Sequence, residues 1–441
     1  MEREEIRENV FLTEYDVLIV GAGVAGMNCA LNLPPEKRVL MIAKGGLTES
    51  DSYLAQGGIC VLRDGDDFEG YFEDTMRAGH YENDPDTVRC MIENSRSTID
   101  GLISLGVRFE RAADNTLLYT REGAHSRPRI VYHADCTGKE IASRLLREVK
   151  KRANVEVLPH VTMLDLVADE EENLCLGAVV RFNRTGELAL VKAESVVLAT
   201  GGVGGLYRHS TNFRTLTGDG VAVALRHGIR VEHADYVQFH PTTLFSKKRG
   251  RRFLISESVR GEGAHLIDRN GGRFVNELAP RDLVTEAIRK KMREEGSEFV
   301  RLDFSSVKGG EETLNRHFPG IVRRCKREGY DILHEPVPVV PAQHYFMGGV
   351  KSDLSGRTSM KNLYAVGETC CNGVHGKNRL ASNSLLESVI FAKRAAEDIA
   401  KKEKTRREGC PAVDWEAYGN LRKRQEEDKK AVRRKINGED E

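Results

Sequence analysis

The sequence predicts an α/β protein in which an α+β domain is inserted into a first domain built on a mostly parallel sheet. Three apolar, strand-like segments each end in a glycine turn, at 15–27, 195–205 and 362–368. We call these three strand-to-glycine junctions the first, second and third joints. Between the second and third of these joints, the chain does not continue the alternation of strands and helices. The length of 441 residues suits two or three domains.

We expect four segments along the chain. The first domain would occupy 1–232 and resume at 349–402, with the inserted capping domain at 233–348. A short helical tail would follow at 403–441, rich in Lys, Arg and Glu and poor in apolar positions. This composition favours a solvated helix or frayed end over a helix that docks on a partner.

The composition is that of a globular protein without a dominant charge. Lys and Arg number 67 and so do Asp and Glu, for a net charge of zero, and 40% of the residues are hydrophobic. Apart from local basic stretches such as Lys247–Arg252, no general field is available to attract nucleic acid or an anionic membrane. The sequence contains no apolar run of about 18 residues or more and starts with charged residues, so we expect a cytoplasmic protein.

The nine cysteines include no CxxC pair and no close Cys/His cluster. We therefore expect reduced thiols, without a disulfide framework and without a metal site. The adjacent Cys370 and Cys371 could be redox-active, although two ordinary thiols in a loop are the favoured interpretation.

The first joint, YDVLIVGAGVAGM, carries the GxGxxG pattern of a dinucleotide site. Gly21 suits a tight turn, Gly23 allows a pyrophosphate to approach the backbone, and Gly26 allows the following helix to pack on the strand. The helix N-terminus would then face the phosphate charge. The pattern alone is weak evidence, because ordinary buried strands also end in glycine turns.

The second strand, RVLMIAK, departs from an ordinary NAD site. An Asp or Glu is expected at its end to hold a ribose hydroxyl, but this chain has Ala43 and Lys44. Three strand-to-glycine joints far apart in the sequence instead resemble the FAD-binding domain of two-dinucleotide-binding-type flavoproteins.

A helix is predicted after the third joint. Ser382, Asn383 or Ser384 can cap its start, and the apolar residues that follow recur at helical spacing. Its unpaired N–H groups would stabilise negative charge on the pyrimidine edge of a flavin.

Polar groups near prolines and glycines point to an anion site. His240, Arg281 and His344 belong to the inserted segment, and Arg379 follows the third joint. Two arginines and two histidines on one cleft would suit a small dicarboxylate, because guanidinium groups bind carboxylates in bidentate fashion. Spacing alone does not show that they converge, and each by itself is more often a structural residue.

Several motifs together resemble the succinate dehydrogenase and fumarate reductase flavoprotein family, from about Tyr15 to about Ala400. They are GAGVAG, AQGGI, HADCTGKEI, ATGG, TGDG, QFHPT, RGEGA, LAPRD, AQHYFMGGV, YAVGE and NRLASNSLLE. Within the family, the segment REGAHSRPRIVYHADCTG and the loop EPVPVVPAQHY resemble the branch that oxidises L-aspartate.

The resemblance implies FAD as cofactor. Asp51 stands where membrane-complex relatives carry the histidine joined to the flavin, so FAD would be bound noncovalently. The implied cofactor residues are Gly21, Ala22, Gly23, Val24, Ala25, Gly26, Lys44, Asp51, Ser52, Tyr53, Leu54, Ala55, Gln56, Gly57, Gly58, Asp219, Glu368, Ser384 and Leu385.

The resemblance also implies roles in substrate binding and catalysis. His240, His344 and Arg379 would hold the substrate carboxylates, and Glu122 would lie near the substrate amino group. Arg281 would exchange the proton. The residues expected beside them are Gln238 and Ser256, with Glu257 and Arg260 as a proton relay.

The implied reaction is the oxidation of L-aspartate to iminoaspartate, with hydride passing to the flavin and on to oxygen or fumarate. It would begin NAD biosynthesis through quinolinate, with a hand-off of the imine to quinolinate synthase. One alternative is a soluble fumarate reductase or a succinate dehydrogenase flavoprotein subunit. An alternative of another class is a noncatalytic flavin-binding subunit that docks through its basic tail.

Overall fold

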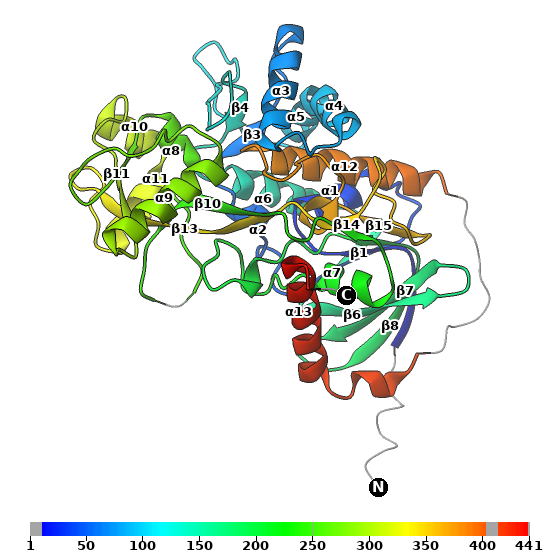
Figure 1. Ribbon diagram of the computed structural model, residues 1–441. Helices are drawn as coiled ribbons and strands as arrows, with labels where there is room; N and C mark the ends of the chain where they lie inside the picture. The colour runs from blue at the N-terminus through cyan, green and yellow to red at the C-terminus, as the bar shows by residue number, and fades with distance from the viewer. Residues whose placement is uncertain (1–10, 249, 403–412, 440–441) are drawn as a thin grey trace.

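The structure, a computed structural model, describes residues 11–248, 250–402 and 413–439 (Figure 1). The α-helices are α1 (Val24–Asn32), α2 (Asp51–Leu54), α3 (Phe68–Ala78), α4 (Pro85–Glu93), α5 (Ser95–Ser104), α6 (Thr137–Val149), α7 (Asp219–Arg226), α8 (Glu257–Gly261), α9 (Arg281–Glu295), α10 (Gly310–His317), α11 (Pro319–Arg327), α12 (Asn383–Ala400) and α13 (Leu421–Asn437). The strands are β1 (Phe11–Val20), β2 (Val39–Ala43), β3 (Gly58–Cys60), β4 (Ile130–Tyr132), β5 (Val155–Pro159), β6 (Val161–Asp169), β7 (Leu174–Phe182), β8 (Leu188–Leu198), β9 (Val231–Glu232), β10 (Val237–Leu244), β11 (His265–Ile267), β12 (Val300–Asp303), β13 (Val337–Phe346), β14 (Gly349–Lys351), β15 (Leu363–Ala365) and β16 (Cys370–Cys371).

The largest sheet brings the three glycine joints together. Its strand order is β5-β2-β1-β8-β7-β6, and β15 also pairs with β8. The strands β5, β2, β1, β8 and β15 are parallel, whereas β6 and β7 form an antiparallel hairpin that leads into β8. Leu198 of β8 pairs with Val20 of β1 on one side and with Ala365 of β15 on the other. The three strands therefore end at one edge of the sheet, and the α/β fold expected from the sequence is confirmed.

Both faces of this sheet are buried. Along β1, Val17 and Ile19 belong to one apolar core, and Leu18 and Val20 belong to the other, as the two-residue repeat of a strand requires. Helices α1, α6 and α12 cover the first face, and α7 with β14 covers the second. Figure 1 shows α1 and α12 lying together over the sheet.

A second sheet has its own apolar core. Its four antiparallel strands follow the order β10-β13-β12-β11, and α8, α9, α10 and α11 pack around it. Figure 1 shows this α+β unit to one side of the larger sheet. It lies between β8 and β15 in the chain, so the expected inserted unit is present, while the boundaries at 233 and 348 stay a prediction.

The C-terminal helix packs on the sheet domain. Val432 of α13 is fully buried near the start of α7, in one apolar cluster with Val203 and Val221. Asp428 and Arg424 of the same helix pair with Arg226 and Asp165.

The expectation of a solvated or frayed tail is therefore wrong for α13. Val432 is buried, Ile436 and Leu421 at the two ends of the helix pack partly buried against apolar clusters, and two ion pairs add to this contact. The part of the expected tail at 403–412 lies outside the described residues.

Within the described ranges, no helix is long and apolar enough to cross a membrane, and no group of three or more His, Cys, Asp or Glu could hold a metal ion. Cys370 and Cys371 form β16 and are buried. Burial raises the pKa of Cys370 well above its ordinary value and that of Cys371 to about 11. Thiols with raised pKa values are poor nucleophiles, which agrees with two ordinary thiols, but the pair lies in a strand and not in the expected loop.

Replacement of Val432 by Ala tests the docking of α13. Loss of two buried methyl groups should lower the free energy of unfolding by about 2 kcal/mol. Urea unfolding monitored by circular dichroism measures the change. The control is Arg433→Ala at the exposed neighbouring position, which should leave stability nearly unchanged; equal effects of the two variants would contradict the packing.

Candidate active site

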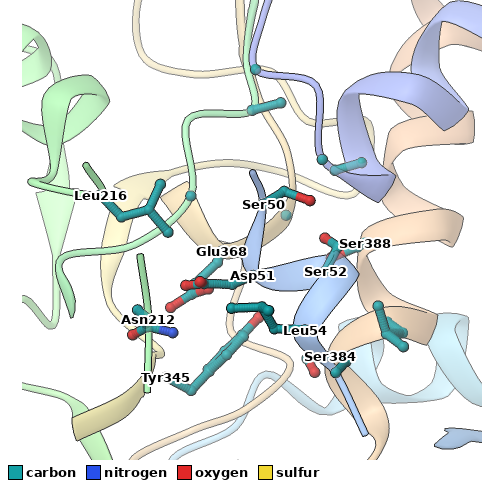
Figure 2. A pocket seen from close by; sticks show the side chains of 18 of the residues that line it. Ser50, Asp51, Ser52, Leu54, Asn212, Leu216, Tyr345, Glu368, Ser384 and Ser388 are labelled. Atoms are coloured by element: carbon teal, nitrogen blue, oxygen red, sulfur yellow. The ribbon is translucent and has the colours of Figure 1, made fainter. Parts of the chain in front are cut away.

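A large cavity opens where the carboxyl ends of β1, β8 and β15 meet. Counting the open solvent at its mouth, its volume is about 1710 Å³. Residues of the second sheet, which we call the capping sheet, and of α12 complete its walls. Figure 2 shows side chains from several distant segments pointing into it. The cavity has room for a dinucleotide and a small substrate.

One end of the cavity is formed by the glycine turn after β1. Gly21 has φ +121°, and a Cβ atom there would lie 2.0 Å from the carbonyl oxygen of Ala199. A Cβ on Gly26 would lie 2.0 Å from the carbonyl oxygen of Gly21, so only glycine lets α1 pack this close to β1. Helix α1 begins at Val24 without a capping side chain at Gly23. This N-terminus is suited to a phosphate group.

Lys44, which follows β2, has an acidic side chain beside it. Its Nζ donates to Asp219 Oδ2 at 2.8 Å and to the carbonyl oxygen of Thr215 at 2.9 Å. Both Lys44 and Asp219 line the cavity. The carboxylate that is missing from the end of β2 is thus supplied by the first residue of α7.

The middle of the cavity carries two buried carboxyl groups. Figure 2 shows Asp51 and Glu368 side by side. Asp51 Oδ1 accepts from the backbone N–H of Phe213 at 3.0 Å, but Asp51 Oδ2 and Gln56 Oε1 are buried without a hydrogen-bond partner. Burial raises the pKa of Asp51 to about 7, and burial with the charge of Asp51 raises the pKa of Glu368 well above its ordinary value. Such groups fit the hydroxyls of a ligand, which can both donate and accept.

Helix α12 points its open end at the cavity. Ser382 occupies the N-cap position with φ +62°, but its hydroxyl does not cap the helix. It donates instead to Glu122 Oε2 at 2.5 Å. The predicted side-chain cap is therefore wrong, and the N–H groups of the first turn are left to stabilise an anionic group beside Ser384 and Leu385, which line the cavity.

The four predicted anion-binding residues converge. All four residues line the cavity. His240 and His344 come from β10 and β13 of the capping sheet, Arg281 begins α9, and Arg379 lies in the segment before α12. The ring centroids of His240 and His344 are 5.1 Å apart. Arg379 lies over the ring of Tyr345 and donates to Ser384 Oγ at 2.8 Å, while its Nε has no hydrogen-bond partner.

This end of the cavity is electrostatically suited to an anion. Burial and the charge of Arg281 lower the pKa of His240 and of His344 well below the ordinary value. Burial and Arg281 also lower the pKa of Arg379 to about 10. The backbone N–H of Thr242 donates to His240 Nδ1 at 3.2 Å, so the proton of this neutral ring is on Nε2 and can be donated.

Glu257 links the two buried arginines of the predicted relay. Its Oε2 lies 2.6 Å from Arg281 Nε, and its Oε1 lies 3.5 Å from Arg260 Nη2. Burial alone would raise the pKa of Glu257, but Arg281 and Arg260 hold it below the ordinary value. The three side chains form a buried chain of charged groups that begins in the cavity.

Glu122 lies at the same end of the cavity, on the loop before β4. It is 3% exposed and accepts hydrogen bonds from Ser382 and from Ser258, the latter at 2.9 Å. Burial, together with the charge of Glu257, raises the pKa of Glu122. A positively charged ligand group beside it would favour its ionised form.

Five residues of the predicted set do not line the cavity: Val24, Gly26, Tyr53, Gln238 and Arg260. Val24 packs in the apolar core under α1. The Gln238 amide is occupied by other protein groups, since its Nε2 donates to Asn378 and Arg379 and its Oε1 accepts from Arg281. The other predicted site residues do line the cavity, which supports the set without testing each role.

Several residues after β8 line the cavity although the sequence did not predict them. Thr211 Oγ1 lies 2.7 Å from His344 Nδ1, and Asn212 Nδ2 donates to the carbonyl oxygen of His344 at 3.2 Å. Arg251 lies near Asp51 and offsets its burial. The signal for Thr211 and Asn212 was the polar run HSTNFRTLTGDG shortly after the second joint, where only TGDG was used, and Arg251 belongs to the basic stretch Lys247–Arg252.

Comparison with known proteins is consistent with this geometry. A family model described as an FAD binding domain matches residues 16–385. An L-aspartate oxidase of Clostridium perfringens is 50% identical over 385 residues, which are 87% of this chain and 86% of that protein. An L-aspartate oxidase of Clostridium acetobutylicum is 48% identical, covering 87% of each.

Among solved structures, E. coli quinol fumarate reductase has a TM-score of 0.85 with 31% sequence identity, covering 93% of this chain and 74% of that one. The cavity fits FAD: the α1 N-terminus for phosphate, unpaired buried oxygens for hydroxyls, and the α12 N-terminus for a flavin edge. FAD is therefore the cofactor.

Replacement of Gly21 by Ala tests whether the glycine turn after β1 binds FAD. The added Cβ would collide with the carbonyl oxygen of Ala199 in a backbone conformation that side chains rarely adopt, so the purified variant should lack flavin absorbance. Gly101→Ala is the control, because a Cβ at this exposed position in α5 meets no atom within 4 Å. A full FAD content in Gly21→Ala would contradict the assignment.

Proposed function

Because this chain belongs to the FAD-binding flavoprotein family that includes the L-aspartate oxidases, we propose that it oxidises L-aspartate to iminoaspartate. The observation that carries the proposal is the convergence of His240, His344, Arg281 and Arg379 on a cavity that also contains Glu122. Four donor groups suit two carboxylates, and a buried carboxylate suits the amino group between them.

The first task of these residues is to bind and orient the substrate. Arg379 offers an unpaired Nε into a buried site, and the neutral His240 and His344 offer ring N–H groups. Two held carboxylates leave a four-carbon substrate little rotational freedom. Bound FAD supplies the hydride acceptor. His240, His344, Arg281 and Arg379, the clamp residues, therefore act mainly by holding the substrate α-carbon within the near-attack range of the flavin.

The second task is to manage protons and to recognise the amino group. Arg281 is a donor group, and the chain through Glu257 to Arg260 can return a proton to it in the direction of fumarate reduction. Glu122, between Ser382 and Ser258, orients the substrate ammonium group. Its charge distinguishes an amino acid from a plain dicarboxylate.

The reduced enzyme passes its electrons to fumarate or oxygen. The unstable imine then passes to quinolinate synthase in the cytoplasm, so that the oxidation of aspartate is the first step of NAD biosynthesis through quinolinate. A soluble fumarate reductase is the second candidate, favoured by the similarity to E. coli quinol fumarate reductase. Four buried clamp groups argue against a noncatalytic flavin-binding subunit, because a scaffold would gain nothing from their desolvation cost.

Anaerobic mixing of the yellow holoenzyme with L-aspartate tests the function. Aspartate should bleach the flavin absorbance and succinate should not, and added fumarate should restore the oxidised spectrum. Bleaching by succinate alone would point to the fumarate reductase and succinate dehydrogenase candidates, and a spectrum unchanged by either compound would overturn both.

Replacement of Glu122 by Gln tests recognition of the amino group. Loss of a charge-assisted contact costs about 1.5–3 kcal/mol, so the KM for aspartate should rise by roughly 10–100-fold. The inhibition constant of succinate should change much less. Glu69→Gln, which removes a charge from an exposed position of α3, is the control; equal weakening of aspartate and succinate would contradict the contact.

A further inference from the structure

We propose that Asn378 is a positioning residue that sets Arg281 and Arg379 by joining the capping unit to the FAD-binding sheet domain. The inference deepens the proposed function and rests on it, since it concerns the two arginines of the dicarboxylate site. The junction consists of Asn378, Gln238, Asp282 and the carbonyl group of Ala78. None of these four residues lines the cavity.

Asn378 is buried between three segments that are distant in the sequence. Its Nδ2 donates to the carbonyl oxygen of Ala78, at the end of α3, at 3.0 Å and to Asp282 Oδ1, at the start of α9, at 3.1 Å. Its Oδ1 accepts from Gln238 Nε2, in β10, at 2.8 Å. At 4% exposure, water does not replace these partners, so both amide hydrogens and the carbonyl oxygen are used within the protein.

Arg281 at one end of the junction and Asp282 at the other determine the direction of every hydrogen bond between them. Arg281 Nη1 lies 2.9 Å from Gln238 Oε1, and because a guanidinium group can only donate, Gln238 must present its oxygen there. Its Nε2 then donates, and Asn378 must accept through Oδ1. The remaining Nδ2 faces the Asp282 carboxylate, which can only accept when ionised. An amide reversed at either position would leave buried groups unpaired.

Gln238 connects the two arginines within this chain of bonds. Its Oε1 holds the guanidinium group of Arg281, and its Nε2 also donates to the backbone carbonyl oxygen of Arg379 at 2.8 Å. Asn378 is the residue directly before Arg379 in the chain. Movement of Asn378 would therefore displace one arginine through the backbone and the other through Gln238.

Asp282 holds the start of α9 to the sheet domain from a second direction. Its Oδ2 lies 2.8 Å from Nε2 of His80, in the loop after α3. The same loop is held to the segment before Asn378, because the N–H of Lys377 donates to the carbonyl oxygen of Gly79 at 3.0 Å. Asp282 directly follows Arg281, so these contacts define where the helix that carries Arg281 begins.

The test uses the holoenzyme and exchanges the donor and the acceptor. Asn378→Asp removes the donor to Asp282 and places two carboxylates together, so it should lower the rate of flavin bleaching at saturating L-aspartate by roughly 10–100-fold. FAD content should stay unchanged. In the double variant Asn378→Asp/Asp282→Asn, an amide, now at position 282, again faces a carboxylate, while the carbonyl oxygen of Ala78 stays without its donor, so part of the lost rate should return.

A general loss of structure would not be repaired by the second substitution, which separates positioning from damage. Glu286→Gln is the matched control, because it removes an exposed carboxylate of α9 that pairs with Arg293 at 3.0 Å. It should leave the bleaching rate unchanged. A bleaching rate of Asn378→Asp equal to wild type, or a double variant no faster than Asn378→Asp, would overturn the proposal.

Two further measurements test the junction when Asn378→Asp loses FAD or when the proposed function fails. Should Asn378→Asp not retain FAD, the milder Asp282→Asn should still slow bleaching, and a normal rate would overturn the proposal. Should aspartate fail to bleach the wild-type flavin, the proposed function falls, and hydrogen exchange at 279–285 then tests the junction. Exchange there should be faster in Asn378→Asp and slower again in the double variant; an unchanged pattern would overturn it.

Discussion

The pairing of β8 with β1 on one side and β15 on the other is the constraint on which the whole cavity depends. Leu198 is level with Val20 and Ala365, so three strands stop together and their glycine turns share one edge. Parallel strands direct their carboxyl ends to the same edge, where ligands bind in open α/β sheets. The chain leaves after β8 and returns before β15, which brings the inserted unit to that edge as well.

The cavity changes in electrostatic character along its length. The α1 N-terminus and the Lys44–Asp219 pair lie at one end, and carboxyl groups with raised pKa values lie in the middle. At the other end, histidines held neutral stand beside Arg281 and Arg379. This order matches phosphate, hydroxyl and dicarboxylate groups in turn, and burial makes each mismatch costly.

Residue type, position near prolines and glycines, and the resemblance of the surrounding motifs were enough to select His240, His344, Arg281 and Arg379. These features could not show their convergence, since that depends on the pairing of strands far apart in the chain. The missed Thr211 illustrates the limit: a threonine in a polar run has no distinctive pattern, and its contact with His344 spans 133 positions.

The sequence by itself determined the alternating strand faces, the three glycine turns and the absence of a dominant charge, because each is a local or compositional property. The tertiary structure decided the rest. Ser382 reads as a helix cap, yet its hydroxyl bonds to Glu122, 260 positions away. Val432 reads as an isolated apolar residue, yet it holds α13 to the domain. Hydrogen-bond partners and apolar contacts of this kind exist only once distant segments are packed together, so no local pattern encodes them.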